Sequence, residues 1–391
     1  MIDYSRIINK ATREMKPSGI RKFFDLAATM EGAISLGVGE PDFQTPWPIR
    51  RAAITALEKG KTFYTANSGL ADLRAGISKY TENTVHTHYN SENEIVVTVG
   101  GSEAIDLSIR AMIEPGDEVL VVEPCFVCYR PIVELCGGIV SVIETKEKDN
   151  FKLTADDLRE KITDKTKALI LPFPNNPTGA IMTREDLEQI ADVLRETNIV
   201  ILSDEIYSEL TYGKKHTSIV EIDGMRERTI LINGFSKGFA MTGWRLGYLC
   251  GPEEMVSQIL KIHQYAIMSS PTVSQYAAIE GLQSCLNDVK MMVAEYDMRR
   301  RFVVDEFNKI GLECFTPEGA FYVFPCIKST GLSSEEFCEK LLFSKKVAVV
   351  PGNAFGDCGE GFIRVSYAYS LKHLKIALKC IKEFLEELKK E

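Results

Sequence analysis

The sequence has no apolar run that approaches the roughly 20 residues a membrane-spanning helix needs. Its first residues, Met1 to Arg6, lack the basic-then-apolar pattern of a secretory signal peptide. The sequence also lacks an excess of positive charge, because its 55 Asp and Glu outnumber its 46 Lys and Arg and give a formal net charge of −9. These absences argue against a membrane protein, a secreted protein and a nucleic-acid-binding protein, and we expect a cytoplasmic location.

Metal-binding and dinucleotide-binding patterns are missing as well. The five histidines form no H-E-x-x-H motif, and the C-x-x-C pair Cys125 and Cys128 has no second pair to complete a zinc site. Redox use of this pair is the alternative, but most of the ten cysteines lie in apolar contexts that suit reduced core residues. The glycines at 37 and 39 lack the third glycine of a dinucleotide loop. We therefore predict no metal and no dinucleotide.

The pattern that is present is an alternation of strands and helices. Short apolar runs predict strands at residues 94–99, 118–122, 139–142, 168–171, 199–203 and 229–232. Helical spacing lies between them, for example at 186–196, where Thr183 and Asp186 form a capping box. Such alternation indicates an α/β fold with a mostly parallel sheet that is covered on both faces.

The length of 391 residues, 45% of them hydrophobic, allows two domains. After about residue 255 long helical segments replace the strand pattern, and the segment 289–310 is expected to link the domains. We expect an N-terminal arm and part of the small domain at 1–45, a large domain at 46–285 and a small α+β domain at 286–391.

The segment from Asn233 to Gly247 follows the last of these strands and contains Lys237 and Arg245. Ligands of open α/β sheets bind where strands end, and a lysine desolvated there has a lowered pKa and attacks carbonyl groups. Ser236 and Arg245 supply a hydroxyl group and a cation that suit a phosphate monoester. An amine beside a phosphate site suggests pyridoxal phosphate, whereas the alternative is a surface lysine in a glycine-rich loop.

A second glycine-rich turn follows strand 94–99. Gly100, Gly101, Ser102 and Glu103 lead from that strand into a helix. Free N–H groups at a helix start, aided by the helix dipole, bind phosphate. An ordinary turn is the alternative.

Polar side chains follow two further strands. Asn176 lies in a turn that two prolines and a glycine hold rigid, so that its amide can donate to a phenolate oxygen or a carboxylate. Asp204 ends a buried strand, where a carboxylate is costly unless it is paired, and a protonated pyridine nitrogen is a suitable partner. Tyr207 can donate to the phenolate oxygen of the same ring. A helix cap or a structural ion pair is the alternative for Asp204.

Two more residues suit such a site. Phe126 can stack on a planar ring, although a core position is the commoner role of a phenylalanine. Arg364 lies inside an apolar strand, where it needs a bidentate carboxylate from a substrate or from the protein.

Taken together and in this order, the motifs resemble those of the class I and II aminotransferases, which are pyridoxal-phosphate-dependent enzymes of fold type I. The resemblance is to the bacterial and archaeal aspartate and aromatic enzymes, and it runs from Gly37 to Arg364. It implies that Lys237 binds the cofactor covalently and later moves the Cα proton of the substrate. It further implies a homodimer, because Tyr64 matches a tyrosine that reaches the phosphate of the neighbouring subunit.

The resemblance also implies the full set of site residues. Those expected at the cofactor are Tyr64, Gly101, Ser102, Glu103 (through its backbone), Phe126, Asn176, Asp204, Tyr207, Ser236, Lys237 and Arg245. Those expected at the α-carboxylate of the substrate are Gly39, Asn176 and Arg364.

The implied activity is the transfer of an amino group from an L-amino acid to a 2-oxo acid such as 2-oxoglutarate, in two half-reactions. The amino acid is aspartate, an aromatic amino acid or a related one. No second arginine is assigned to the distal carboxylate that aspartate would bring, and Phe24 and Tyr322, which are expected near the pocket, allow aromatic or large substrates. The alternative is a C–S lyase on the same scaffold that acts by β-elimination. A regulator-type effector domain is the other rival, and it would need an attached DNA-binding segment.

Overall fold

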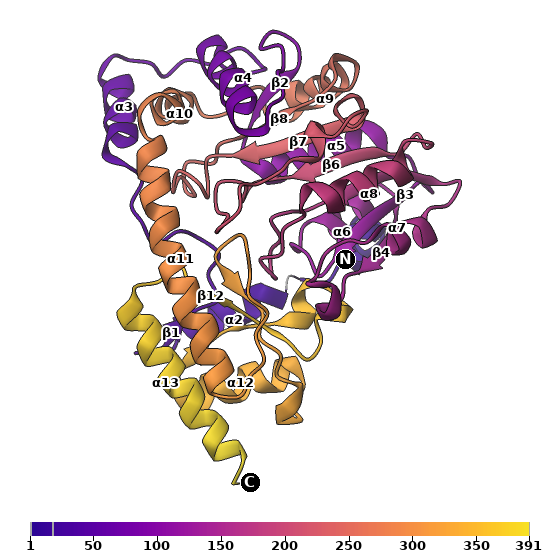
Figure 1. Ribbon diagram of the computed structural model, residues 1–391. Coiled ribbons are helices and arrows are strands. Elements are labelled where there is room, and N and C mark those ends of the chain that lie inside the picture. Colours follow the sequence, from indigo (N-terminus) through magenta and orange to yellow (C-terminus); the bar gives the residue numbers. More distant parts are fainter. Residues whose placement is uncertain (1, 18, 391) are drawn as a thin grey trace.

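The computed structural model describes residues 2–17 and 19–390, without the side chains of residues 21, 22, 24 and 25. A large upper part built on a sheet and a smaller lower part are joined by one long helix, α11 (Leu286–Lys309) (Figure 1). Within the described residues no helix is long and apolar enough to cross a membrane.

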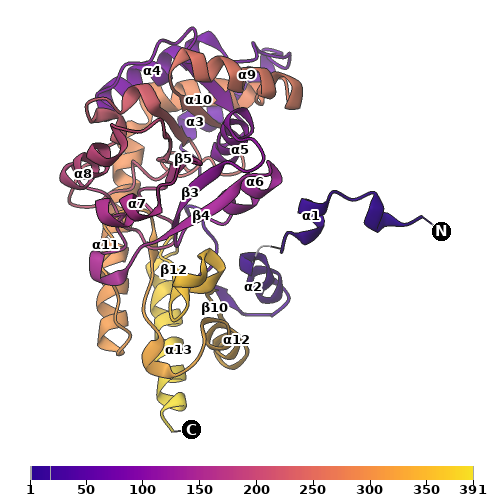
Figure 2. The same ribbon diagram turned by 90° about the vertical axis from the view of Figure 1, so that its right-hand side faces the viewer.

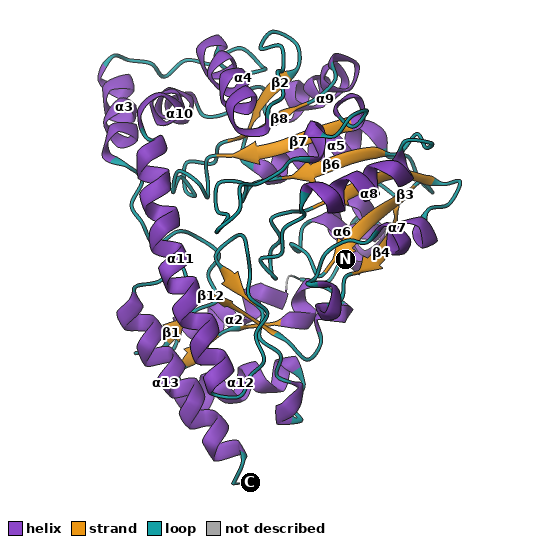
Figure 3. Ribbon diagram, viewed as in Figure 1, coloured by secondary structure: helices purple, strands orange, loops and turns teal. Residues whose placement is uncertain are grey.

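A seven-stranded sheet forms the centre of the upper part (Figure 3). Its strand order is β2-β8-β7-β6-β5-β3-β4. The strands are β2 (Ile95–Thr98), β3 (Glu118–Glu123), β4 (Ile139–Glu144), β5 (Thr166–Leu171), β6 (Val200–Asp204), β7 (Thr229–Gly234) and β8 (Gly247–Cys250). The pairs from β4 through β7 are parallel, whereas β8 is antiparallel to both β7 and β2.

The six predicted strands and the mostly parallel sheet are confirmed. The strand β8 was not predicted, because its four residues begin with Gly247 and directly continue the glycine-rich segment after Lys237. The capping box predicted at Thr183 and Asp186 is also confirmed, at the start of α8 (Arg184–Leu194).

Helices cover both faces of the sheet, which explains why most of its strands contain consecutive apolar residues. In β3, Val119 and Val121 belong to the core formed with α5 (Gly101–Met112), α6 (Tyr129–Leu135) and α9 (Glu253–Ala266). Leu120 and Val122, which point the opposite way, belong to the larger core. The helices that contribute to that second core include α3 (Trp47–Glu58), α4 (Ala71–Val85), α7 (Ala155–Lys161), α8 and α10 (Thr272–Ser284).

The lower part is the α+β unit that the sequence predicted. Its three-stranded antiparallel sheet has the order β11-β12-β9, with β9 (Tyr322–Val323), β11 (Val350–Pro351) and β12 (Ile363–Ser366). The helices α12 (Ser334–Lys345) and α13 (Leu371–Leu388) pack against each other beside it.

The N-terminal segment contributes to this lower part. Strand β1 (Ile34–Ser35) pairs in parallel with β10 (Val347–Ala348), and α2 (Gly19–Ala28) contacts β10 and β11. The short helix α1 (Lys10–Glu14) and the N-terminus extend to one side of the molecule (Figure 2). The domain boundaries at 45 and 285 stay a prediction.

Candidate active site

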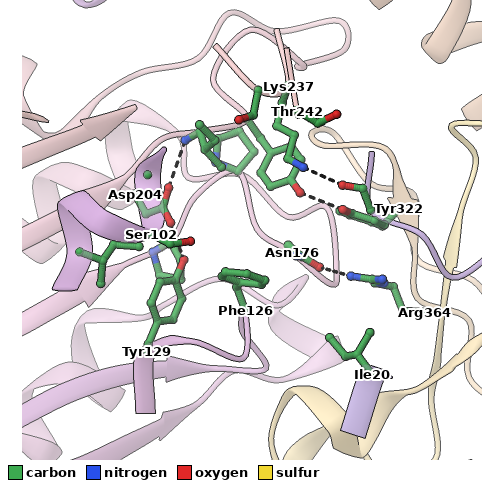
Figure 4. A pocket seen from close by; sticks show the side chains of 18 of the residues that line it. Ile20, Ser102, Phe126, Tyr129, Asn176, Asp204, Lys237, Thr242, Tyr322 and Arg364 are labelled. Atoms are coloured by element: carbon green, nitrogen blue, oxygen red, sulfur yellow. Dashed lines mark hydrogen bonds between the residues drawn. The ribbon is translucent and has the colours of Figure 1, made fainter. Parts of the chain in front are cut away.

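A cavity of about 320 Å³ lies where the parallel strands end and where the two parts of the molecule face each other (Figure 4). Eleven of the thirteen residues predicted from the sequence line it. They are Gly39, Gly101, Ser102, Phe126, Asn176, Asp204, Tyr207, Ser236, Lys237, Arg245 and Arg364. The other two, Tyr64 and Glu103, do not line the cavity.

Lys237 follows β7 and is half-buried in this cavity. Its Nζ donates a hydrogen bond of 2.6 Å to the carbonyl oxygen of Gly39. Burial lowers the pKa of the Lys237 amine to about 8, with Arg364 and Arg245 adding to the shift and Glu40 opposing it. A substantial fraction of this amine is therefore neutral near physiological pH, as a nucleophile or a proton acceptor requires.

Asp204 ends β6 on the opposite side of the cavity and is 7% exposed. Its Oδ2 accepts a hydrogen bond of 2.7 Å from the hydroxyl of Tyr129, and its Oδ1 accepts one of 3.2 Å from the amide of Ile206. Burial raises the pKa of the Asp204 carboxyl, and these two hydrogen bonds oppose the rise. A buried carboxylate of this kind is stabilised by a cationic group placed in the cavity.

The start of α5 forms the end of the cavity nearest to Arg245. Gly100 precedes the helix with φ +77° and ψ 171°, a conformation that is essentially confined to glycine. A Cβ atom on Gly100 would lie 2.8 Å from Nη2 of Arg245, and one on Gly247 would lie 2.6 Å from the carbonyl carbon of Gly100. The two glycines thus let the guanidinium of Arg245 and the start of β8 approach the start of α5 closely.

The side chain of Glu103 points away from this end of the cavity. It accepts a hydrogen bond from the amide of Val99, and its Oε1 lies 3.0 Å from Nδ1 of the buried His263. Its backbone amide belongs to the first turn of α5, which is the group that the sequence analysis assigned to phosphate.

Arg364, on β12, is 3% exposed and occupies the other end of the cavity. It donates 2.8 Å to Oδ1 of Asn176 and also donates to the carbonyl oxygen of Gly37. Its Nε has no hydrogen-bond partner within the described part of the chain. The structure therefore presents a buried cation that is hydrogen-bonded to neutral oxygens, an arrangement that leaves its charge for a ligand.

Other residues of the lining were not assigned from the sequence. They are Ile20, Ile105, Tyr129, Pro172, Pro174, Ile206 and Thr242, with Tyr322 expected only near the pocket. Tyr129 lies three residues after Phe126, and that spacing was the one signal for it. The side chain of Phe24 lies outside the described residues.

Tyr64 lies on the surface, in the loop that follows α3, and its side chain is 82% exposed. Phe63 beside it is 81% exposed and Tyr265 is 90% exposed. The loop that carries Tyr64 contacts the segment just after α9, since Nδ2 of Asn67 donates a hydrogen bond of 2.9 Å to the carbonyl oxygen of Met268. Its predicted contact with a neighbouring subunit stays a prediction.

No metal cluster accompanies the cavity. Across residues 2–17 and 19–390, no group of three or more His, Cys, Asp or Glu side chains could hold a metal ion. Cys125 and Cys128 are free thiols, and burial raises the pKa of both.

Comparison with known proteins places this chain in a family. The family model of the class I and II aminotransferases matches residues 31–381. An aspartate aminotransferase of Pyrococcus abyssi is 44% identical over 378 residues, 96% of this chain and 97% of that protein. An aromatic-amino-acid aminotransferase of Thermococcus litoralis is 45% identical over 378 residues, with the same coverage of 96% and 97%.

Comparison of the fold with solved structures also indicates the aminotransferase family. The crystal structure of the aromatic aminotransferase from Pyrococcus horikoshii OT3 superposes with a TM-score of 0.90 at 42% identity, covering 95% of this chain and 99% of that one. These similarities favour amino-group transfer over β-elimination. The chain belongs to the class I and II aminotransferase family, whose members are pyridoxal-phosphate-dependent transaminases of fold type I.

Proposed function

We propose that this chain moves the amino group of an L-amino acid to a 2-oxo acid with pyridoxal phosphate held in the cavity around Lys237. One observation carries the proposal. A single cavity brings together an amine whose pKa is about 8, a buried carboxylate and a buried cation, on Lys237, Asp204 and Arg364.

The residues present fit the cofactor at each of its polar groups. Ser102, Ser236, Arg245 and the amides at the start of α5 would hold the phosphate. Asp204 would pair with the ring nitrogen, which supplies the positive charge that this buried carboxylate needs. When bound, the cofactor withdraws electrons from the Cα of the substrate.

Three further residues would position the ring. Phe126 would stack on it, while Tyr207 and Asn176 would donate to its oxygen.

Lys237 has two roles in this proposal. It would bind the cofactor covalently, and its amine, when free, would take up the Cα proton of the substrate and return a proton later. Its lowered pKa suits both roles, because the amine must be neutral to accept a proton. The substrate α-carboxylate would bind Arg364 and Asn176 together with the backbone of Gly39.

The lining of the cavity favours a substrate with an uncharged side chain. Its described cationic side chains are Lys237, Arg245 and Arg364, and the proposal assigns each of them to another group. Ile20 and Tyr322 add apolar surface near Arg364. We therefore favour aromatic or large apolar amino donors. Aspartate is the second candidate, because a relative of comparable identity is named an aspartate aminotransferase.

We further propose a homodimer with shared active sites and a cytoplasmic location. The exposure of the aromatic residues Phe63, Tyr64 and Tyr265 supports the dimer, since large exposed apolar side chains that gather on one surface mark a contact with a partner. If the sites are shared, mixing a Tyr64→Ala variant with a Lys237→Ala variant restores activity above that of either alone. Additive activities would contradict shared sites.

The direct test adds single amino acids to the purified, cofactor-loaded protein and follows the visible absorption band. Loss of the band with phenylalanine, and its return with 2-oxoglutarate, are expected. Lys237→Ala should lack the band of the covalently bound cofactor. Release of pyruvate and ammonia without a 2-oxo acid would instead establish the lyase activity.

A further inference from the structure

Tyr322 contacts two of the residues predicted for the site, Tyr207 and Arg364. It lies on β9 in the smaller part of the molecule and is 1% exposed. Its hydroxyl oxygen lies 2.8 Å from that of Tyr207, which comes from the segment after β6 in the larger part (Figure 4). Its ring lies beneath the guanidinium of Arg364, with Cζ 4.4 Å from the ring centroid.

The direction of the hydrogen bond between the two tyrosines follows from their protons. Each hydroxyl has one hydrogen to donate. In the proposed function Tyr207 donates its hydrogen to the ring oxygen of the cofactor, so Tyr322 must donate to Tyr207. A donor whose own oxygen accepts a hydrogen bond is polarised and donates more strongly. Burial raises the pKa of Tyr322, which keeps its hydroxyl protonated for this purpose.

The surroundings of Tyr322 hold its hydroxyl in place. Tyr207 is the one hydrogen-bond partner that the described side chains and backbone give to this hydroxyl. A Cβ atom on Gly39 would lie 2.5 Å from the Tyr322 hydroxyl oxygen, which shows how tightly the loop at Gly39 packs on it. The carbonyl oxygen of Gly39 in turn accepts the hydrogen bond from Lys237.

The ring of Tyr322 has a separate effect on Arg364. The guanidinium lies over two aromatic rings, with its Cζ 4.4 Å from the ring centroid of Tyr322 and 4.7 Å from that of Phe355. Ring faces attract a cation and restrict its orientation, which leaves the edge of the guanidinium for a carboxylate. β9 and β12 are neighbouring strands, so Tyr322 and Arg364 are held together by the sheet itself.

We propose that Tyr322 is a positioning residue for two groups of the site: its hydroxyl orients Tyr207 toward the cofactor, and its ring face holds Arg364 ready for the substrate carboxylate. The inference rests on the proposed function. Tyr322 would thereby connect the residues that bind the cofactor with those that bind the substrate carboxylate.

Two substitutions separate the two effects. Tyr322→Phe removes the hydroxyl and keeps the ring, whereas Tyr322→Leu removes both. The first readout is the pH at which the visible band of the loaded enzyme titrates. Hydrogen-bond donors to the anionic ring oxygen stabilise the cofactor bound to Lys237 in its deprotonated form. Loss of such a donor therefore raises the pH at which the band titrates. We expect a rise of about 1 to 2 pH units in Tyr207→Phe. We expect a smaller rise of about 0.3 to 0.5 unit in Tyr322→Phe.

The second readout is the dissociation constant of butanoate, an unreactive carboxylate too small to need the rest of the pocket. We expect it to change less than about twofold in Tyr322→Phe and to rise about three- to tenfold in Tyr322→Leu, because only the second substitution removes the ring. Tyr367→Phe and Tyr367→Leu are the matched controls. Tyr367 is a buried tyrosine outside the cavity whose hydroxyl donates 3.0 Å to the carbonyl oxygen of Ala320.

The possible results distinguish a failure of this inference from a failure of the proposed function. If Tyr207→Phe raises the titration midpoint and Tyr322→Phe does not, the hydroxyl role of Tyr322 is wrong while the proposed function stands. If Tyr207→Phe has no effect either, the role of Tyr207 in the proposed function fails and the inference fails with it. Should Tyr322→Leu not fold, the phenylalanine variant still decides the role of the hydroxyl. Equal butanoate affinities in the two folded variants would overturn the role of the ring.

Discussion

The hydroxyl of Tyr129 lies 2.7 Å from Oδ2 of Asp204, and both side chains are almost completely buried. The tyrosine therefore supplies a charge-assisted hydrogen bond to the carboxylate proposed to face the ring nitrogen of the cofactor. The ring of Tyr129 also meets that of Phe126 edge to face, with centroids 6.1 Å apart. Tyr129, which was not predicted from the sequence, thus contacts two residues that were, Asp204 and Phe126.

Tyr129→Phe should weaken cofactor binding about tenfold and lower turnover, because the ionised form of Asp204 loses a donor of about 1.5 kcal/mol. Measuring the cofactor dissociation constant of the cofactor-free protein checks the prediction. The control is Tyr89→Phe, since Tyr89 is fully buried and its hydroxyl has no partner in the described part of the chain. Equal affinities in the two variants would contradict the role of Tyr129.

The reactivity of Lys237 should depend on pH in a characteristic way. Burial lowers the pKa of this amine from 10.5 to about 8, so in the cofactor-free protein its reductive methylation should be half-maximal near pH 8. Ordinary lysines continue to gain reactivity up to about pH 10.4. Mass spectrometry of peptides across the pH range measures both. A Lys237 profile that coincides with that of the surface lysines would refute the shift.

The same shift affects stability with a defined sign. Between pH 8 and 10.5 the unfolded chain holds the proton on Lys237 more tightly than the folded chain does. The contribution of this residue to the free energy of unfolding is therefore lowest below pH 8 and rises as the pH passes through that window. Lys237→Met should remove this rise in the cofactor-free protein, as denaturant titrations at several pH values would show.

Arg364→Lys should lower kcat/KM for phenylalanine about 100-fold, because an ammonium group cannot form two parallel hydrogen bonds to a carboxylate. Steady-state kinetics provides the measurement. Arg300→Lys is a matched control, since Arg300 is also buried but pairs with Asp297 outside the cavity. That control should lose stability and keep its kcat/KM. A similar loss of activity in both variants would show that Arg364 acts only on the fold.

Gly100→Ala should raise the cofactor dissociation constant about tenfold, because the new methyl group meets Arg245 and the backbone conformation is strained. Gly213→Ala separates the two causes. Gly213 also has a positive φ, of 73°, but nothing lies within 4 Å of its added Cβ. Both variants should lose stability, and only the first should lose affinity. Unchanged affinity in Gly100→Ala would argue against a phosphate at this helix start.

Local features of the chain were predictable because their causes lie within a few residues. Six apolar runs became strands of the central sheet, and Thr183 caps α8 through Asp186 as expected. The lysine segment, the glycine-rich helix start and the arginine in an apolar strand each carried enough chemistry to be singled out. The strand β8 escaped prediction, because its four residues become a strand only through pairing with β2 and β7.

By itself, the sequence determined the α/β class, the family resemblance and most of the residues that line the cavity. Only the tertiary structure decided how these residues meet. Arg364 reaches Asn176 across 188 positions of the chain, and Tyr322 reaches Tyr207 across 115. Such contacts depend on how the smaller part of the molecule packs against the end of the parallel sheet. No local pattern encodes that arrangement, because it is set by the burial of apolar surface contributed by the whole chain.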